Sequence, residues 1–129
     1  MTILPITSLF AAGFALALVA LSIAISLRRV KLGVMIGQSE DEVLRNRIRA
    51  HGNFVEYVPL GLIILGLVEA HGISIAAVLS AGAALALGRV LHAIGMLRPS
   101  DAVRGLGMAL TYLWLISSAL VIGGSVVFF

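Results

Sequence analysis

No Asp, Glu, Lys or Arg occurs in residues 1–27 or in residues 105–129, so both ends of the chain are long apolar segments. Two further segments, mostly apolar, lie between them. A helix needs about 20 apolar residues to cross the ~30 Å of hydrocarbon in a bilayer, and each segment has about that length. The alternating pattern of a β-barrel strand is absent. We therefore expect a single-domain (1–129), all-α integral membrane protein, a bundle of four transmembrane helices at about 3–27, 49–69, 73–97 and 105–129.

The overall composition supports a membrane protein and excludes several function classes. Of 129 residues, 60% are hydrophobic and 12% are charged, and the mean hydropathy is +1.13. A soluble domain of this size cannot bury so much apolar surface. The chain has no cysteine, which excludes disulfides and a cysteine nucleophile, and its three histidines are too scattered to predict a metal site. The net charge of +3 is carried beside apolar segments, which favours anionic lipid or an anionic ligand over nucleic acid.

The basic residues are distributed unevenly between the connections. Residues 28–48 carry most of them, residues 98–104 carry Arg98 and Arg104, and the turn at 70–72 carries no Lys or Arg. Cytoplasmic loops of membrane proteins are enriched in Lys and Arg. We therefore expect 28–48 and 98–104 on the cytoplasmic side of a bacterial inner membrane and both termini outside. This topological role alone would account for several of the charges.

Local signals mark the helix ends. Ser39 and Glu42 have the spacing of a capping box, which predicts that the second helix begins near Glu40, well before its apolar part. Gly72 predicts the end of that helix, because glycine is common just after a helix C-terminus. Pro99 predicts the end of the third helix, because proline cannot continue the hydrogen-bond pattern.

One face of the second helix is polar. At 100° per residue, four polar side chains fall within about 80° of one another. They are Arg45, Arg49, Asn53 and Glu56, with Tyr57 just beyond. Glu56 lies roughly 10 Å deeper in the membrane than Arg49, too far for a good ion pair within one helix. Because a lone carboxylate in hydrocarbon costs several kcal/mol, we expect Glu56 to have a partner from another helix.

The third helix offers that partner. Arg89 stands nine residues before Arg98, which places it roughly 13 Å below the same surface, at a depth similar to that of Glu56. His92 follows one turn later on the same face. A purely structural Glu56–Arg89 pair remains one interpretation. The other is a polar pocket between the second and third helices, open to the cytoplasm. Its expected lining is Arg49, Asn53, Glu56, Tyr57, Arg89 and His92, with Arg28, Arg29 and Arg104 at its mouth.

The chemistry of this pocket restricts its ligand. It has an excess of positive charge and one carboxylate. Arginine binds carboxylates through paired hydrogen bonds, and Glu56 would accept from an ammonium group. The residues therefore favour a small molecule with more than one carboxylate and one amino group. The apolar walls and the surrounding lipid would admit a hydrophobic second substrate.

The segment Arg-Ala-His-Gly-Asn-Phe-Val-Glu-Tyr-Val-Pro, residues 49–59, closely resembles the signature of the MAPEG family, the membrane-associated proteins of eicosanoid and glutathione metabolism. The family pattern is Arg-Ala-x-x-Asn-x-x-Glu-x-x-Pro, and this chain matches it at every fixed position. Arg28 and Arg29 precede the signature, and Gly-Arg-Val-Leu-His-Ala follows at 88–93. Together these segments resemble the small bacterial branch of the family.

The resemblance implies a homotrimer that binds glutathione, as a co-substrate, between neighbouring subunits near the cytoplasmic face. It implies a hydrophobic electrophile that arrives from the bilayer, and no metal. Arg104 would stabilise the glutathione thiolate, and His92 is a second candidate as donor or base. The residues implied to contact glutathione are Arg28, Arg29, Arg49, Asn53, Glu56, Tyr57 and Arg89.

We therefore expect a glutathione-dependent transferase or peroxidase. Two alternatives remain open. The first is a protein that binds glutathione or a lipid mediator without catalysis, because His92 and Met96 stand where family enzymes have tyrosines. The second is a small transporter that uses Glu56 for ion coupling.

Overall fold

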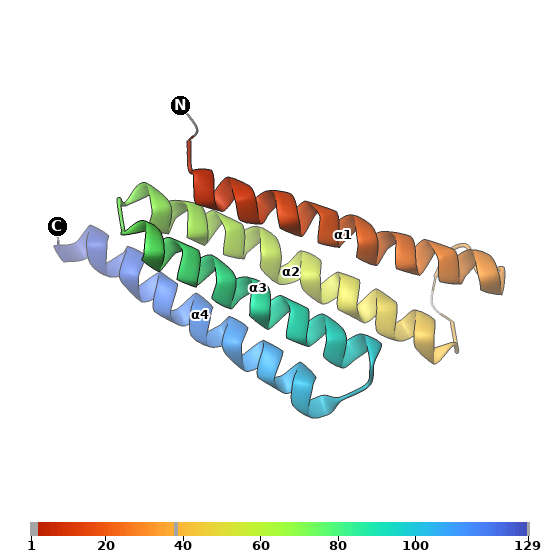
Figure 1. Ribbon diagram of the computed structural model, residues 1–129. Coiled ribbons are helices and arrows are strands. Elements are labelled where there is room, and N and C mark those ends of the chain that lie inside the picture. The colour runs from red at the N-terminus through yellow and green to blue at the C-terminus, as the bar shows by residue number, and fades with distance from the viewer. Residues whose placement is uncertain (1–2, 38, 129) are drawn as a thin grey trace.

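The computed structural model describes residues 3–37 and 39–128, which form four long helices (Figure 1). These are α1 (Pro5–Leu32), α2 (Glu42–Ala70), α3 (Ile75–Leu97) and α4 (Asp101–Phe128). Each of them is long and apolar enough to cross a membrane. The all-α fold with four candidate membrane-spanning helices is the one that the apolar segments predict.

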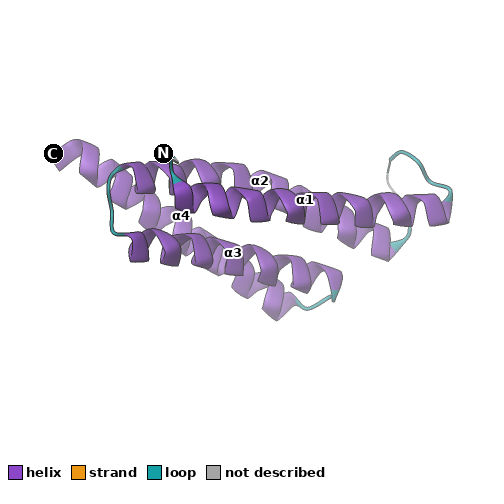
Figure 2. Ribbon diagram, turned by 45° about the horizontal axis from the view of Figure 1, so that its top comes forward, coloured by secondary structure: helices purple, strands orange, loops and turns teal. Residues whose placement is uncertain are grey.

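The helices run antiparallel along the chain, and the connections lie at the two ends of the bundle (Figures 1 and 2). The α1–α2 and α3–α4 connections share one end, and the short α2–α3 turn shares the other end with both ends of the described chain. The two connections that carry the basic residues therefore lie at the same end. In the described residues α1 contacts α2 and α3, α4 contacts α3 and α2, and α1 and α4 do not meet.

Helix α1 extends past the expected apolar segment at 3–27 and ends at Leu32. Arg28, Arg29 and Lys31 occupy its last turns because arginine and lysine are good helix formers and stabilise a helix C-terminus. Gly33 ends the helix with a φ of 69°, a conformation that residues with a side chain rarely adopt.

The start of α1 is capped by another helix. Its own N-cap residue, Leu4, makes no side-chain cap hydrogen bond. Instead the carboxylate of Glu69, in the last turn of α2, accepts hydrogen bonds from the backbone N–H groups of Ile6 at 2.9 Å and Thr7 at 2.8 Å. A negative charge at a helix N-terminus also interacts favourably with the helix dipole. Glu69 therefore fixes the start of α1 against the end of α2.

Helix α2 begins at Glu42 rather than near Glu40, and its cap is Asp41 rather than Ser39. The Asp41 carboxylate accepts a hydrogen bond of 2.7 Å from the backbone N–H of Leu44. Ser39 accepts from the backbone N–H of Asp41 at 3.2 Å and so lies one step outside the helix. The charged carboxylate of Asp41 makes a stronger cap bond than the neutral hydroxyl of Ser39 would. Asp41 also has the extended backbone that an N-cap residue adopts.

The starts of α3 and α4 also have side-chain caps. Ser74 caps α3, which begins two residues later than expected, and Ser100 lies before α4 and accepts from the backbone N–H of Val103. Helix α4 therefore begins at Asp101, one turn before the uncharged segment at 105–129. Gly72, with a φ of 72°, follows the end of α2 as expected.

Helices α3 and α4 approach each other closely through glycines. A methyl group placed on Gly107 would lie 2.5 Å from the backbone nitrogen of His92 and 2.7 Å from the carbonyl oxygen of Gly88. A methyl group on Gly95 would collide with the backbone of Arg104. In a bilayer the lipid is as apolar as the helix surfaces, so the hydrophobic effect does not hold helices together. Small residues at helix crossings let the backbones approach and pack closely instead. This contact brings the Arg104 backbone against the third helix.

The core lies between all four helices, and the outward faces are apolar as well. Phe14 of α1 packs edge-on against Phe54 of α2, with ring centroids 5.8 Å apart. Trp114 is buried in the same cluster. Large hydrophobic side chains on the outside, such as Leu16 and Leu120, are more than 70% exposed in the isolated chain. An apolar exterior of this kind suits contact with lipid.

Candidate functional site

A polar cavity of about 430 Å³ opens between α2, α3 and α4, in the half of the bundle that holds the two basic connections. This volume lies within the roughly 300–1,000 Å³ typical of small-molecule sites. Five of its lining residues come from α2, two from α3 and one from α4. They are Ile48, Arg49, Gly52, Asn53, Glu56, His92, Met96 and Arg104.

The helical repeat explains how α2 contributes. Arg49, Asn53 and Glu56 are four and three residues apart, so they stand on one face in successive turns. Gly52, between them, leaves room where a larger side chain would enter the cavity. His51 points the other way, and its Nε2 lies 3.1 Å from the Ser22 hydroxyl of α1. The polar face that the spacing predicts therefore forms one wall of the cavity.

Helix α3 contributes His92 and Met96, which are one turn apart and both buried. Met96, which stands where the resemblance places a tyrosine, forms part of the cavity wall. His92 is 5% exposed and shares the cavity lining with Arg49 of α2 and Arg104 of α4. An imidazole in this position can donate to or accept from a ligand atom.

Arg104 reaches the cavity from the first turn of α4. Its guanidinium Nη2 lies 3.0 Å from an Asp101 carboxylate oxygen, and its side chain is about half exposed. A surface pair of this kind is weak, so the guanidinium can exchange Asp101 for an anionic ligand at little cost. The cavity thus holds two arginines, Arg49 and Arg104, and one carboxylate, Glu56.

Arg89 is near the cavity but faces away from it. It is 2% exposed and donates to the Asn53 Oδ1 at 2.5 Å and to the Thr111 hydroxyl at 2.6 Å. Its guanidinium also lies over the Tyr57 ring, 5.0 Å from the centroid. Arg89 therefore joins α2, α3 and α4 behind the cavity wall.

The expected Glu56–Arg89 ion pair does not form. Equal depth in the membrane is not enough, because Arg89 points between α2 and α4, whereas Glu56 faces the open cavity. In the described residues the ion pairs are Arg28–Asp41 and Arg104–Asp101, and Glu56 belongs to neither. The carboxylate of Glu56 is thus available to a ligand.

Tyr57 lies beside the cavity rather than in its lining. Its hydroxyl is 3.4 Å from that of Tyr112 on α4, and the ring centroids are 6.0 Å apart. The two tyrosines continue the polar network one turn deeper than Asn53, on the α2–α4 side. Tyr112 is about half exposed, so this pair marks the deep boundary of the polar region.

Arg28 and Arg29 do not reach the cavity within one chain. Arg28 makes a two-point contact with the Asp41 carboxylate, with distances of 3.0 and 2.6 Å. Arg29 donates to the backbone carbonyl of Val34. Both residues order the α1–α2 connection, on a different side of α2 from Arg49.

Two functional positions escaped the sequence reasoning. Thr111 is fully buried and holds Arg89 through its hydroxyl, which itself donates to the Gly107 carbonyl at 2.9 Å. A signal was present, because Thr111 stands seven residues after Arg104 and so faces the same way. Gly107 was overlooked because the chain is rich in glycine and no spacing singles it out.

Comparison with known proteins decides the family. The model of the MAPEG family matches residues 7–124, which is most of the chain. This chain belongs to the MAPEG family. The chain is 30% identical over 107 residues to "Inner membrane protein YecN" of Escherichia coli strain K12, covering 83% of this chain and 82% of that protein. The same identity and coverage apply to the protein of that name from E. coli O6:H1. No solved structure matches the chain.

Family membership explains why residues of the family signature line the cavity. The chain is a membrane protein of a family concerned with glutathione and eicosanoid metabolism, and three fixed positions of the family signature, Arg49, Asn53 and Glu56, line the cavity. The fourth, Ala50, is buried where it leaves the helices room to pack. The fifth, Pro59, lies inside α2, which continues through it to Ala70.

Proposed function

We propose that the cavity binds glutathione and that the protein is a glutathione-dependent transferase or peroxidase of a bacterial inner membrane. The observation that carries the proposal is the arrangement of Arg49, Arg104 and Glu56 around one cavity of about 430 Å³. Glutathione carries carboxylates, one ammonium group and a thiol that ionises, and this cavity offers Arg49 for a carboxylate, Arg104 for the thiolate and Glu56 for the ammonium. The inner-membrane location of the similar YecN protein supports the compartment.

Each side chain has a task in this proposal. Arg49 binds a glutathione carboxylate through paired hydrogen bonds, and Glu56 accepts from the glutathione ammonium. The Asn53 Oδ1 already accepts a hydrogen bond from Arg89, so the amide N–H₂ group of Asn53 remains to donate to a peptide carbonyl of the ligand. Arg104, held only by Asp101 at the surface, turns toward the sulfur.

Catalysis depends on the thiolate. A free thiol has a pKa near 8.5, and only its thiolate is a good nucleophile. A guanidinium beside the sulfur stabilises the thiolate and lowers the thiol pKa. The thiolate then attacks an electrophilic carbon, a C–S bond forms, and the leaving group departs with its electron pair. With a hydroperoxide, two glutathiones are oxidised to the disulfide while the peroxide is reduced to alcohol and water.

A homotrimer is part of the proposal. Within one chain Arg28 and Arg29 lie away from the cavity, so they contact glutathione only if a neighbouring subunit supplies them. The open side of the cavity would then be closed by that neighbour. In this arrangement the two basic connections face the cytoplasm and both termini face outward.

Calorimetric titration of detergent-purified protein with glutathione tests the proposal. We expect binding to the wild type, and at least about a tenfold loss in Arg49→Ala and in Glu56→Gln, since each removes a charge-assisted contact. Arg45→Ala is the matched control, because Arg45 stands one turn before Arg49 on the same helix but does not line the cavity. Turnover is then measured with an activated aryl chloride and a lipid hydroperoxide. A folded wild type that does not bind glutathione would refute the proposal.

Binding without turnover is the second candidate. It is favoured by His92 and Met96, which line the cavity at the positions where the resemblance places tyrosines. Glutathione binding that Arg49→Ala abolishes, combined with no turnover over a broad panel of electrophiles, would establish it.

A further inference from the structure

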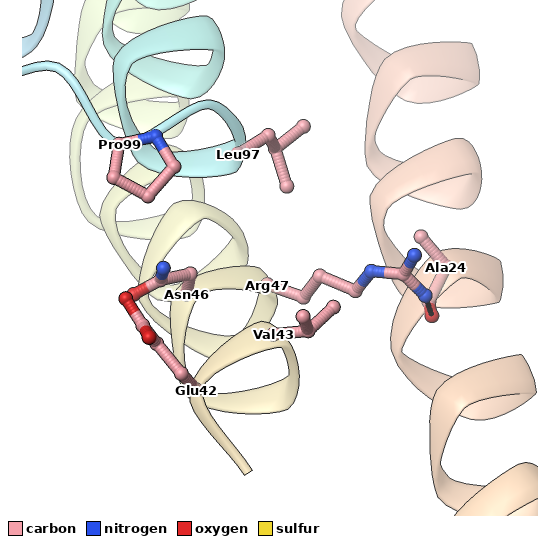
Figure 3. Close-up of a pocket in the computed structure, with 7 residues that line it drawn as sticks. All are labelled: Ala24, Glu42, Val43, Asn46, Arg47, Leu97 and Pro99. Carbon is pink, nitrogen blue, oxygen red and sulfur yellow. Dashed lines mark hydrogen bonds between the residues drawn. The ribbon is translucent and has the colours of Figure 1, made fainter.

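A second cavity lies on the other side of α2. Arg47 and Glu56 are nine residues apart and so stand about 180° apart around the helix. The cavity has a volume of about 410 Å³ and lies at the basic end of the bundle, between α1 and the α2–α3 pair. Figure 3 shows Arg47 reaching from α2 across to α1, with Leu97 beside it. It shares no lining residue with the glutathione cavity.

An apolar groove continues this cavity toward the middle of the bundle. It has a volume of about 260 Å³ and runs between α1 and α3, from Leu97 past Leu21 and Ala93 to Phe14. Leu97 lines both spaces. Ala24, which lines the cavity at Arg47, stands one turn from Leu21, which lines the groove. The two spaces are therefore adjacent, one polar and one apolar, and together offer a polar end and an apolar length.

Arg47 supplies the charge at the polar end. Its Nη1 donates to the backbone carbonyl of Ala24 at 2.6 Å, which fixes the side chain across the site. A guanidinium has five donors, so further N–H groups remain for an anion. The ion pairs of the described residues are Arg28–Asp41 and Arg104–Asp101, and Arg47 takes part in neither.

The dimensions select the ligand. Phe14 and Ala24 are ten residues apart, a distance of about 15 Å along α1, which equals about half of the ~30 Å hydrocarbon layer. The groove itself runs from Phe14 to Leu21 on α1, about 10 Å, and its volume of about 260 Å³ over that length leaves room for one alkyl chain but not for a helix ~10 Å across. An occupant therefore needs an anionic group at the membrane surface and a chain as long as one leaflet.

We propose that this groove binds a glycerophospholipid from the cytoplasmic leaflet. The phosphate lies at Arg47, and one acyl chain lies between α1 and α3. Glu42 lines the same cavity on the side away from α1 (Figure 3), so a headgroup that carries an ammonium beyond its phosphate complements both charges. The site is separate from the glutathione cavity and does not depend on the function proposed for it.

Native mass spectrometry of the detergent-purified protein, titrated with dioleoylphosphatidylethanolamine, tests this proposal. We expect one tightly retained lipid per chain and about tenfold weaker binding in Arg47→Gln, which loses the charge-assisted contact. Arg45→Gln is the matched control, since Arg45 is an exposed arginine on the same helix outside both spaces. Dioleoylglycerol, which has the chains but no phosphate, should bind the wild type about as weakly as phosphatidylethanolamine binds Arg47→Gln.

The apolar part is tested separately. Ala93→Trp fills the groove and should abolish lipid retention, whereas Ala83→Trp, at an exposed alanine on the same helix, should not. Equal lipid binding by Arg47→Gln and Arg45→Gln, or by Ala93→Trp and Ala83→Trp, would overturn the proposal. So would an oligomer that dissociates in Ala93→Trp while lipid retention is unchanged, because another copy of the chain would then occupy the groove.

Discussion

Replacement of Arg89 separates two roles that this arginine can have. The family resemblance implies a contact with a glutathione carboxylate, whereas the structure shows a guanidinium bonded to Asn53 and Thr111 and 2% exposed. Hydrogen bonds to a charged group contribute about 1.5–3 kcal/mol each. The short bonds to Asn53 and Thr111 therefore contribute about 3–6 kcal/mol before the cost of burying the cation is subtracted. Relief from burying a cation offsets part of this in Arg89→Met. We expect a net loss of about 1–3 kcal/mol, and a fall of about 5 °C or more in the unfolding midpoint.

Thermal unfolding of the purified protein without glutathione measures this loss. Arg98→Met is the control, because Arg98 is an exposed arginine on the end of the same helix and should change the midpoint little. Thr111→Val gives an independent check, since it removes the Thr111 acceptor while keeping the shape of the side chain. An unchanged midpoint in Arg89→Met together with lost glutathione binding would refute the structural role and restore the family-implied one.

Three further perturbations test the packing and the caps. Glu69→Ala should lower the unfolding free energy by about 1–2 kcal/mol in thermal melts, because it removes the cap of α1, while Glu69→Gln should cost less since its amide oxygen still accepts. Gly107→Leu should prevent the α3–α4 contact and abolish monodisperse protein on size-exclusion chromatography, and an unaffected elution profile would contradict the close approach. The hydrogen bond from Arg28, aided by the backbone N–H of Leu44, lowers the pKa of Asp41 to about 2. The stability that this depressed pKa confers is complete above the ordinary carboxyl pKa and is lost as the pH falls toward 2, so the midpoint should fall between about pH 4 and 2.5 in the wild type and less in Asp41→Asn.

The helical period explains why much of the cavity was predictable. Arg49, Asn53 and Glu56 were placed on one wall by residue spacing alone, and His92 followed from its offset on the next helix. The number of helices followed from the number of apolar segments, whereas the helix ends follow from the capping residues outside those segments. These features depend on local geometry, which a single sequence contains.

Features that depend on tertiary contacts were not predictable in the same way. The expected depth placed Arg89 level with Glu56, but the direction of its side chain follows from the buried Thr111 hydroxyl on α4, a helix where only Arg104 had an expected role. The cap of α2 was assigned to Ser39, whereas Asp41 takes it with the help of Arg28 from α1. In both positions a partner from another helix decided between two locally acceptable arrangements.

The cap on α1 has a consequence for the order of assembly. The bond between Ile6 and Glu69 joins positions 63 residues apart, so α1 is synthesised and can enter the bilayer before the group that fixes its start exists. Among the described residues of α1, only Phe14 is buried. A helix with so little buried surface must remain stable in lipid without partners. Its uninterrupted apolar sequence allows this, and docking against α2 can then wait until Glu69 reaches the opposite surface.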